Sequence, residues 1–185
     1  MIYFIKKPLV FLTSVLGVIS LVLLSPISEA KDLKGTQCKV DFSPSQIEVL
    51  TKSYRYGRPF GLEYTLPAIA WQESSAGEVL INVSDPSFGY YHALLSSAAN
   101  REQIVSNSDL NKLAHALVKS IELSASFAIR ELLFWKQVHG EGEWSKIWAS
   151  YNAGYNYDST AGKRYSESIL QKINYLKDCH DFNRK

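Results

Sequence analysis

The chain has 185 residues, of which 46% are hydrophobic and 21% are charged, which is ordinary for a globular protein with a buried core. Its formal net charge of +2 is too small to predict nucleic-acid binding, and no Lys/Arg cluster lies downstream of the N-terminal segment. A weakly basic surface is compatible with an acidic polymer such as a cell wall.

The N-terminal segment has the layout of a secretory signal. Lys6 and Lys7 precede an uncharged apolar run at 8–24, and small residues follow at the two positions that a signal peptidase reads. The run is near the short end of a membrane span, so an uncleaved membrane anchor is the alternative. Residues 1–30 are therefore predicted to direct export, and 31–185 to form a domain in the periplasm or cell envelope.

Two cysteines, Cys38 and Cys179, lie at the two ends of the exported part. In an oxidising compartment the simplest use is one disulfide that joins these ends, and the alternative is two unrelated buried thiols. The four histidines show no ligand-like spacing with each other or with the cysteines, so the sequence predicts no metal site and no cofactor. They are His92, His115, His139 and His180.

The first helix is predicted over 44–57 from its end signals. Ser43 suits the N-cap, Pro44 the first helical position, Gln46 the capping box and Gly57 the end.

The rest of the chain indicates a single all-α domain, α+β at most, with a functional loop region at 75–92. A second helix at 66–74 is predicted to end through Gly77, and 78–90 to be a loop with a small β excursion. Helical patterns then continue almost to the end of the chain. They are 109–123 with Ser108 as the cap, 126–140 ending at Gly140, 143–154 ending at Gly154, and 161–179.

Glu73 is an acidic residue on an apolar helix face, since Leu66 and Ile69 lie seven and four residues before it. Poor solvation and the negative end of the helix dipole both favour the neutral carboxyl, which can act as a general acid. The alternatives are a solvent-facing Glu at a helix end, or one that is paired with an arginine such as Arg130.

Three short segments follow one another along the chain in an order that matters for the interpretation. They are "AIAWQESSAG" at 68–77, "SFGYYH" at 87–92 and "WASYNAG" at 148–154. Together they resemble the lysozyme-like superfamily of soluble lytic transglycosylases and goose-type lysozymes. That family has Glu-Ser at a helix end, then Ser-x-Gly-Leu-Met-Gln, then Ala-x-Tyr-Asn-Ala-Gly. "KRYSESIL" at 163–170 resembles the family's fourth region. The resemblance covers about residues 60–175 and implies a lysozyme-like helical domain with a substrate cleft.

The resemblance implies that Glu73 protonates the glycosidic oxygen and then acts as a base. It implies that Ser74 contacts the sugar, that Gly89 lets the backbone approach the substrate, and that Tyr90 and Tyr91 line the cleft, although both tyrosines could be core residues. It also implies that Tyr151 forms a hydrogen bond near the acid, that Asn152 binds sugar, and that Tyr165 holds the intermediate. The full predicted substrate-binding set is Ser74, Ser87, Gly89, Tyr90, Tyr91, His92, Tyr151, Asn152 and Tyr165.

The sequence departs from the family pattern at two places. Tyr90, Tyr91 and His92 stand where the family has Leu-Met-Gln, so the substrate contact of that glutamine is altered. Ala161 stands where an acidic residue often precedes the tyrosine of the fourth region.

Most glycosidases use two carboxylates, whereas the resemblance implies that lytic transglycosylases use one. In those enzymes the N-acetyl group of the substrate stabilises C1, and O6 of muramic acid attacks to give a 1,6-anhydro end. The segment at 73–89 is also similar to the goose-type one, in which an Asp near the position of Asp85 positions water; here Asp85 could equally form an Asp-Pro turn. The second Asp of that segment is absent, with Leu94 at about its place.

The expected activity is therefore peptidoglycan cleavage by a lytic transglycosylase. A hydrolytic lysozyme that uses Glu73 with Asp85 is the alternative, and a non-catalytic wall-binding module is a further one. The expected partners are peptidoglycan glycan strands, in the setting of wall remodelling or of a secretion, conjugation or phage apparatus.

Overall fold

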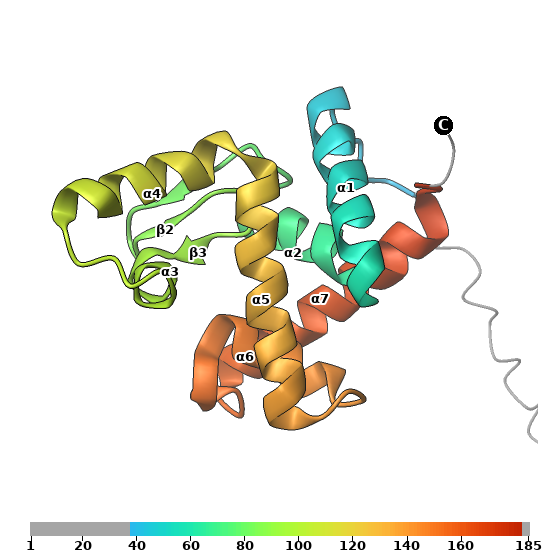
Figure 1. Ribbon diagram of the computed structural model, residues 1–185. Coiled ribbons are helices and arrows are strands. Elements are labelled where there is room, and N and C mark those ends of the chain that lie inside the picture. Colours follow the sequence, from blue (N-terminus) through green and yellow to red (C-terminus); the bar gives the residue numbers. More distant parts are fainter. Residues whose placement is uncertain (1–37, 183–185) are drawn as a thin grey trace, which may run out of the picture. The chain divides into compact units, whose positions relative to one another are not determined.

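The structure is a computed structural model that describes residues 38–182, so the predicted targeting segment at 1–30 lies outside the described residues. Within that range the chain forms one mostly helical domain with a small antiparallel sheet (Figure 1). The seven α-helices of this part of the chain are α1 (Pro44–Gly57), α2 (Thr65–Ser74), α3 (Leu95–Arg101), α4 (Asn107–Lys119), α5 (Ile121–His139), α6 (Trp144–Ala153) and α7 (Thr160–Cys179). The shorter elements are strands β1 (Ile81–Asn82), β2 (Ser87–Phe88) and β3 (Ala93–Leu94), and 3-10 turns η1 (Arg58–Phe60) and η2 (Gly154–Asn156).

Helix α1 begins and ends as its sequence predicts. The Ser43 hydroxyl accepts the Gln46 backbone N–H at 3.3 Å, and the Gln46 side chain accepts the Ser43 N–H at 2.9 Å, which completes a capping box. Pro44 occupies the first turn, where a missing N–H costs nothing.

Helix α2 ends at Ser74, as predicted, but Ser75 and not Gly77 is the first residue of its end. Ser75 and Ala76 already have left-handed backbone angles, with φ of 50° and 55°, so the chain leaves the helix two residues before Gly77. The Ser74 hydroxyl stabilises this exit because it accepts the Gly77 N–H at 3.0 Å. Glu73 is consequently in the last turn of α2.

The predicted boundary of the next helices is also corrected. Ser106, not Ser108, caps α4, because its hydroxyl accepts the Asp109 N–H at 3.1 Å. The chain then breaks at Ser120, which has extended backbone angles and caps α5 by accepting the Leu123 N–H at 3.1 Å. A serine hydroxyl replaces the missing backbone partner at such a start, so the break between these two helices lies at Ser120 and not at 124–125 as predicted.

The β excursion predicted for the loop is a three-stranded sheet in the order β1-β2-β3. Ile81 pairs with Phe88, and Phe88 pairs with Ala93, so both pairings are antiparallel. Strand β3 lies at 93–94, beyond the predicted loop and inside a segment that was expected to be helical.

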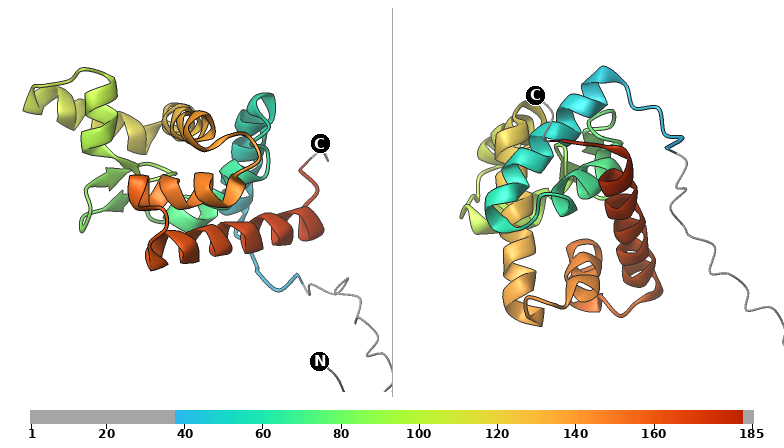
Figure 2. Two further views of the ribbon diagram at one scale, coloured as in Figure 1. Left: turned by 90° about the horizontal axis from the view of Figure 1, so that it is seen from below. Right: turned by 90° about the vertical axis from the view of Figure 1, so that its right-hand side faces the viewer.

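Helix α5 runs between two groups of elements (Figure 1). On one side lie the sheet, α3 and α4, and on the other lie α1, α2 and α7. Each group has its own cluster of buried apolar side chains, and α5 supplies residues to both, Phe127 to the smaller one and Leu132 to the larger. Figure 2 shows α6 lying against α7. A single long helix thus holds the two groups together.

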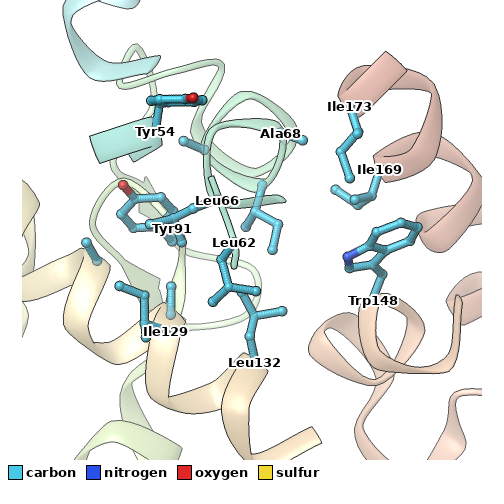
Figure 3. Close-up of a cluster of buried hydrophobic side chains, with 14 of the residues drawn as sticks. Tyr54, Leu62, Leu66, Ala68, Tyr91, Ile129, Leu132, Trp148, Ile169 and Ile173 are labelled. Carbon is cyan, nitrogen blue, oxygen red and sulfur yellow. The ribbon is translucent and has the colours of Figure 1, made fainter. Parts of the chain in front are cut away.

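The larger cluster is the main core (Figure 3). Leu62, Leu66 and Leu132 have no exposed surface, and each such side chain contributes roughly 1.5–3 kcal/mol by leaving water. The predicted Cys38–Cys179 disulfide is present and closes a sequence separation of 141 residues. A loop of that length stabilises by up to about 5 kcal/mol in the chain-entropy view. Within residues 38–182, no helix combines the length and apolar character needed to cross a membrane.

Candidate active site

A cleft of about 310 Å³ lies where the end of α2, the sheet, α3, α5 and α6 meet. Six of the residues predicted from the sequence line it. They are Glu73, Asp85, Ser87, His92, Tyr151 and Asn152. A larger cavity of about 730 Å³ lies between the α3–α4 connection and α5, and none of the predicted site residues lines it.

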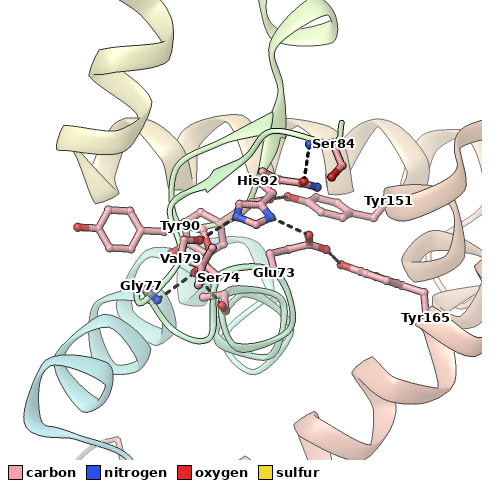
Figure 4. A network of polar contacts seen from close by, with 12 residues as sticks. Glu73, Ser74, Gly77, Val79, Ser84, Tyr90, His92, Tyr151 and Tyr165 are labelled. Atoms are coloured by element: carbon pink, nitrogen blue, oxygen red, sulfur yellow. Dashed lines mark hydrogen bonds and ion pairs between the residues drawn. The ribbon is translucent and has the colours of Figure 1, made fainter. Parts of the chain in front are cut away.

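Glu73 lines the cleft, and its two carboxylate oxygens have different neighbours (Figure 4). Its side chain is 18% exposed, and its Oε1 accepts the Tyr165 O–H at 2.5 Å. Arg130, the alternative partner, instead pairs with Glu102 at 2.8 Å. The acid is therefore neither fully solvent-facing nor neutralised by an arginine.

Tyr165 reaches Glu73 from α7 and is itself buried. Burial, and then the nearby charge of Glu73, raise the pKa of Tyr165 well above its ordinary value of 10.0. Its ring stacks on that of Tyr151, with centroids 6.4 Å apart, and burial likewise raises the pKa of Tyr151. Both phenols therefore remain neutral, so the Tyr165 hydroxyl is a permanent donor to the carboxylate.

His92 faces the second oxygen of Glu73, with Nδ1 at 3.5 Å from Oε2 (Figure 4). Its other nitrogen, Nε2, lies 2.9 Å from the Val79 carbonyl oxygen. Burial alone would lower the pKa of His92, but the contacts with Glu73 and Val79 outweigh it, and the pKa is raised above 6.5.

Ser74 does not contact the cleft, which corrects its predicted contact with sugar. It has no exposed surface, and its hydroxyl bonds to the backbone of Ala70, Gly77 and Tyr90. Its function in this structure is to tie the end of α2 to the following loop.

The positions of Gly89, Tyr90 and Tyr91 also correct the predictions. Tyr91 is a core residue without exposed surface, and its hydroxyl bonds to Ser53 at 2.7 Å. Tyr90 lines a separate small cavity between α1 and the loop at 76–78. Gly89 is needed for packing against protein: its φ is +85°, and a Cβ there would lie 2.6 Å from the Leu117 carbonyl oxygen.

Tyr151 is placed next to the acid as predicted, but its hydrogen bond goes to the backbone. Its hydroxyl donates to the Tyr91 carbonyl oxygen at 2.8 Å, directly before His92. Ser87 is buried, whereas Asp85 is exposed in the β1–β2 connection, and both line the cleft. Asn152 lines it from the last turn of α6, which ends at Gly154 as predicted.

Comparison with known proteins identifies one relative. It is the "Uncharacterized 20.7 kDa protein in vs-regB intergenic region" of Enterobacteria phage T4, 30% identical over 156 aligned residues that cover 74% of this chain and 83% of the relative. The chain belongs to the family of this phage protein. No family model matches the sequence, and no solved structure matches it.

In this member of the phage protein's family, the cleft contains a further carboxylate, besides Glu73 and Asp85, that the sequence analysis did not single out. Glu131 on α5 pairs with Arg101 of α3, and its Oε1 accepts the Trp135 indole N–H at 2.6 Å. The signal was present, because Glu131 lies three residues after Ala128 and four before Trp135 on the buried face of α5. Among residues 38–182, no group of three or more His, Cys, Asp or Glu side chains could hold a metal ion.

Proposed function

We propose that the protein is a peptidoglycan lytic transglycosylase that cleaves the β-1,4 bond between N-acetylmuramic acid and N-acetylglucosamine. The observation that carries the proposal is the placement of Glu73: a mostly buried carboxylate that lines a cleft, with Oε1 bound to Tyr165 and Oε2 beside His92. General acid catalysis needs a carboxyl in such a position, held by neighbours and within reach of a bound oxygen. The resemblance of the motifs around Glu73 and at 149–154 supports the same chemistry.

In the proposed reaction, Glu73 gives a proton to the glycosidic oxygen as the bond to C1 breaks. The N-acetyl group of the substrate stabilises the positive charge that develops at C1. The O6 hydroxyl of muramic acid then bonds to C1 and returns its proton to Glu73, which gives a 1,6-anhydro end without using water. No cofactor takes part.

The other residues of the cleft supply polar groups of the kind that sugars need. Ser87 and Asn152 offer a hydroxyl and an amide to the hydroxyl and N-acetyl groups of the substrate. Tyr165 keeps the carboxylate of Glu73 in one orientation by donating to Oε1.

Hydrolysis by a goose-type mechanism is the second candidate, because Asp85 lines the same cleft as Glu73. In that case Asp85 would position the water that replaces O6 as the nucleophile. Glu131 is a poorer choice for that task, since Arg101 and Trp135 already occupy its oxygens. Wall binding without turnover is the third candidate. It does not explain why Glu73 contacts Tyr165 and His92.

The proposed setting is the bacterial cell envelope. Disulfides such as Cys38–Cys179 persist mainly outside the cytoplasm. The relative is a phage protein, and this favours a phage setting over a secretion or conjugation apparatus. The proposed partner is the glycan strand of peptidoglycan.

The test is mass spectrometry of purified peptidoglycan digested by the protein and, in parallel, by Glu73→Gln. Products lighter than hydrolysed muropeptides by one water, and resistant to borohydride reduction, are expected from the unmodified protein alone. Reducible products would show instead that the protein is a hydrolytic lysozyme. No products from either protein, with binding to peptidoglycan retained, would favour the wall-binding module.

A further inference from the structure

The contacts of His92 determine which of its two nitrogens carries a proton. A carbonyl oxygen only accepts hydrogen bonds, so Nε2, which lies 2.9 Å from the Val79 oxygen, must be the N–H donor. The neutral ring is therefore protonated at Nε2, and the nitrogen that gains or loses a proton is Nδ1. Nδ1 is the atom that faces Oε2 of Glu73, at 3.5 Å.

The proton of Glu73 is confined to one oxygen in the same way. Oε1 accepts the Tyr165 O–H at 2.5 Å, so this oxygen is occupied as an acceptor. Oε2 remains to carry the acidic proton, and it faces Nδ1 of His92 (Figure 4). The two atoms that can exchange a proton thus face each other.

The backbone of His92 has an unusual conformation, which directs the imidazole ring toward Glu73. Its φ is +45°, a left-handed value that costs a residue with a side chain about 1 kcal/mol or more. The turn that imposes it is closed by the His92 N–H, which donates to the Gly89 carbonyl at 3.2 Å. With its side chain only 9% exposed, the ring is fixed against Glu73.

The other ionisable groups around the ring do not compete with Glu73 for this proton. They are Asp85, Arg101, Glu131, Tyr151 and Tyr165. Arg101 and Glu131 pair with each other, and Asp85 is exposed in the β1–β2 connection. Tyr151 and Tyr165 remain neutral because burial raises the pKa of both.

We propose that His92 and Glu73 share one proton, so that the two side chains together act as the general acid. In this pair His92 is the positioning residue that holds the proton before it moves to Glu73. This inference rests on the proposed function. The proton moves from Nδ1 to Oε2 and on to the glycosidic oxygen, which keeps the electron pair of the broken bond to C1. When O6 bonds to C1, its proton passes to Oε2 and returns to Nδ1, so charge and protons balance.

Sharing the proton between His92 and Glu73 extends the pH range in which a proton is available for catalysis. Two coupled groups titrate as a pair, and the form with one proton persists until the higher of the two titrations. Burial lowers the pKa of His92, but the contacts with Glu73 and Val79 together outweigh burial and raise the pKa above 6.5. His92 therefore keeps its proton to a higher pH than an imidazole without the carboxylate would.

The first arm of the test is histidine NMR on the purified protein, which needs no substrate. The His92 signals, assigned through backbone connectivity, are expected to show the Nε2–H form at high pH and a titration midpoint that falls in Glu73→Gln. The exposed His115 is the internal control, and its signal should be the same in both proteins. A midpoint of His92 that does not respond to Glu73→Gln overturns the proposal.

The second arm compares the pH profile of peptidoglycan cleavage in the unmodified protein and in His92→Gln. Glutamine is the residue of the resembling family at this position and keeps an N–H group that can donate to the Val79 oxygen, but it does not titrate. The alkaline limb of the cleavage rate is expected to move to lower pH in His92→Gln. An unmoved alkaline limb contradicts proton sharing. Absence of cleavage in the unmodified protein would instead overturn the proposed function, and the NMR arm would then decide the pairing by itself.

Discussion

Glu73 and Glu131 are two of the carboxylates that line the cleft, and their surroundings differ. Glu73 ends α2 and contacts Tyr165 and His92, whereas Glu131 lies within α5 and contacts Arg101 and Trp135. Their side chains are similarly shielded, at 18% and 26% exposure. Burial therefore does not distinguish the two groups.

The partners distinguish them. A guanidinium does not give up its proton in proteins, and an indole N–H only donates, so neither partner of Glu131 can exchange a proton with it. An imidazole titrates near neutral pH and can both give and take one. The side of the cleft at Glu73 is thus equipped for proton transfer, and the side at Glu131 for holding α3 against α5.

The largest expected effect separates the two carboxylates by activity. Glu73→Gln should lower peptidoglycan cleavage by about 100-fold or more, because a positioned general acid contributes about 10²–10⁴-fold. Glu131→Gln should reduce cleavage much less, since its partners cannot take part in proton transfer. Muropeptide release followed by chromatography measures both. Equal losses of cleavage activity in Glu73→Gln and Glu131→Gln would contradict the assignment of proton transfer to Glu73 alone.

The next effect concerns the hydroxyl that orients Glu73. Tyr165→Phe should lower the cleavage rate by about tenfold, since a hydrogen bond to a charged group contributes about 1.5–3 kcal/mol and 1.4 kcal/mol corresponds to tenfold. Tyr175→Phe is the matched control on α7, because its hydroxyl bonds to the Val40 backbone N–H instead. The rate of that control should equal that of the unmodified protein. An unaffected rate in Tyr165→Phe would show that the hydroxyl is dispensable.

On the other side of the cleft, a change in stability is expected. Arg101→Gln should reduce the free energy of unfolding by about 1 kcal/mol, because it leaves a partly buried carboxylate with one partner fewer. Lys112→Gln removes the well-exposed pair with Asp109 and should change stability less. Urea denaturation followed by circular dichroism measures both variants. Equal stability of the two variants would contradict the role of the Glu131–Arg101 ion pair in holding α3 against α5.

The smallest effect is a pH dependence of stability. The pKa of His92 is higher in the folded protein than its ordinary value of 6.5, so protonated His92 stabilises the fold. That stabilisation is fully present below pH 6.5 and is lost as pH rises through the raised value. The unmodified protein should therefore exceed His92→Gln in stability by more at pH 5.5 than at pH 9. In a Glu73→Gln background this difference should vanish or reverse, because burial then exceeds the effect of Val79; a difference of the same sign there would point to Val79 rather than Glu73 as its source.

The sequence by itself determined the local features of this protein. The capping box at Ser43 and Gln46, the end of α6 at Gly154 and the disulfide between Cys38 and Cys179 follow from nearby residues or from a simple count. The apolar face that carries Glu73 was also readable, because helix periodicity alone places residues four and seven apart on one side.

Tertiary structure decided which neighbours each of these residues meets. Tyr91 and His92 were both predicted to line the cleft, but Tyr91 lies in the core and only His92 reaches the acid. The turn closed by the His92 N–H and the Gly89 carbonyl determines which way each side chain points. Glu131 could not be assigned a partner from the sequence, because Arg101 lies 30 residues away and reaches it only when α3 packs on α5. Contacts between distant segments depend on packing, and packing is decided by the whole core rather than by any local pattern.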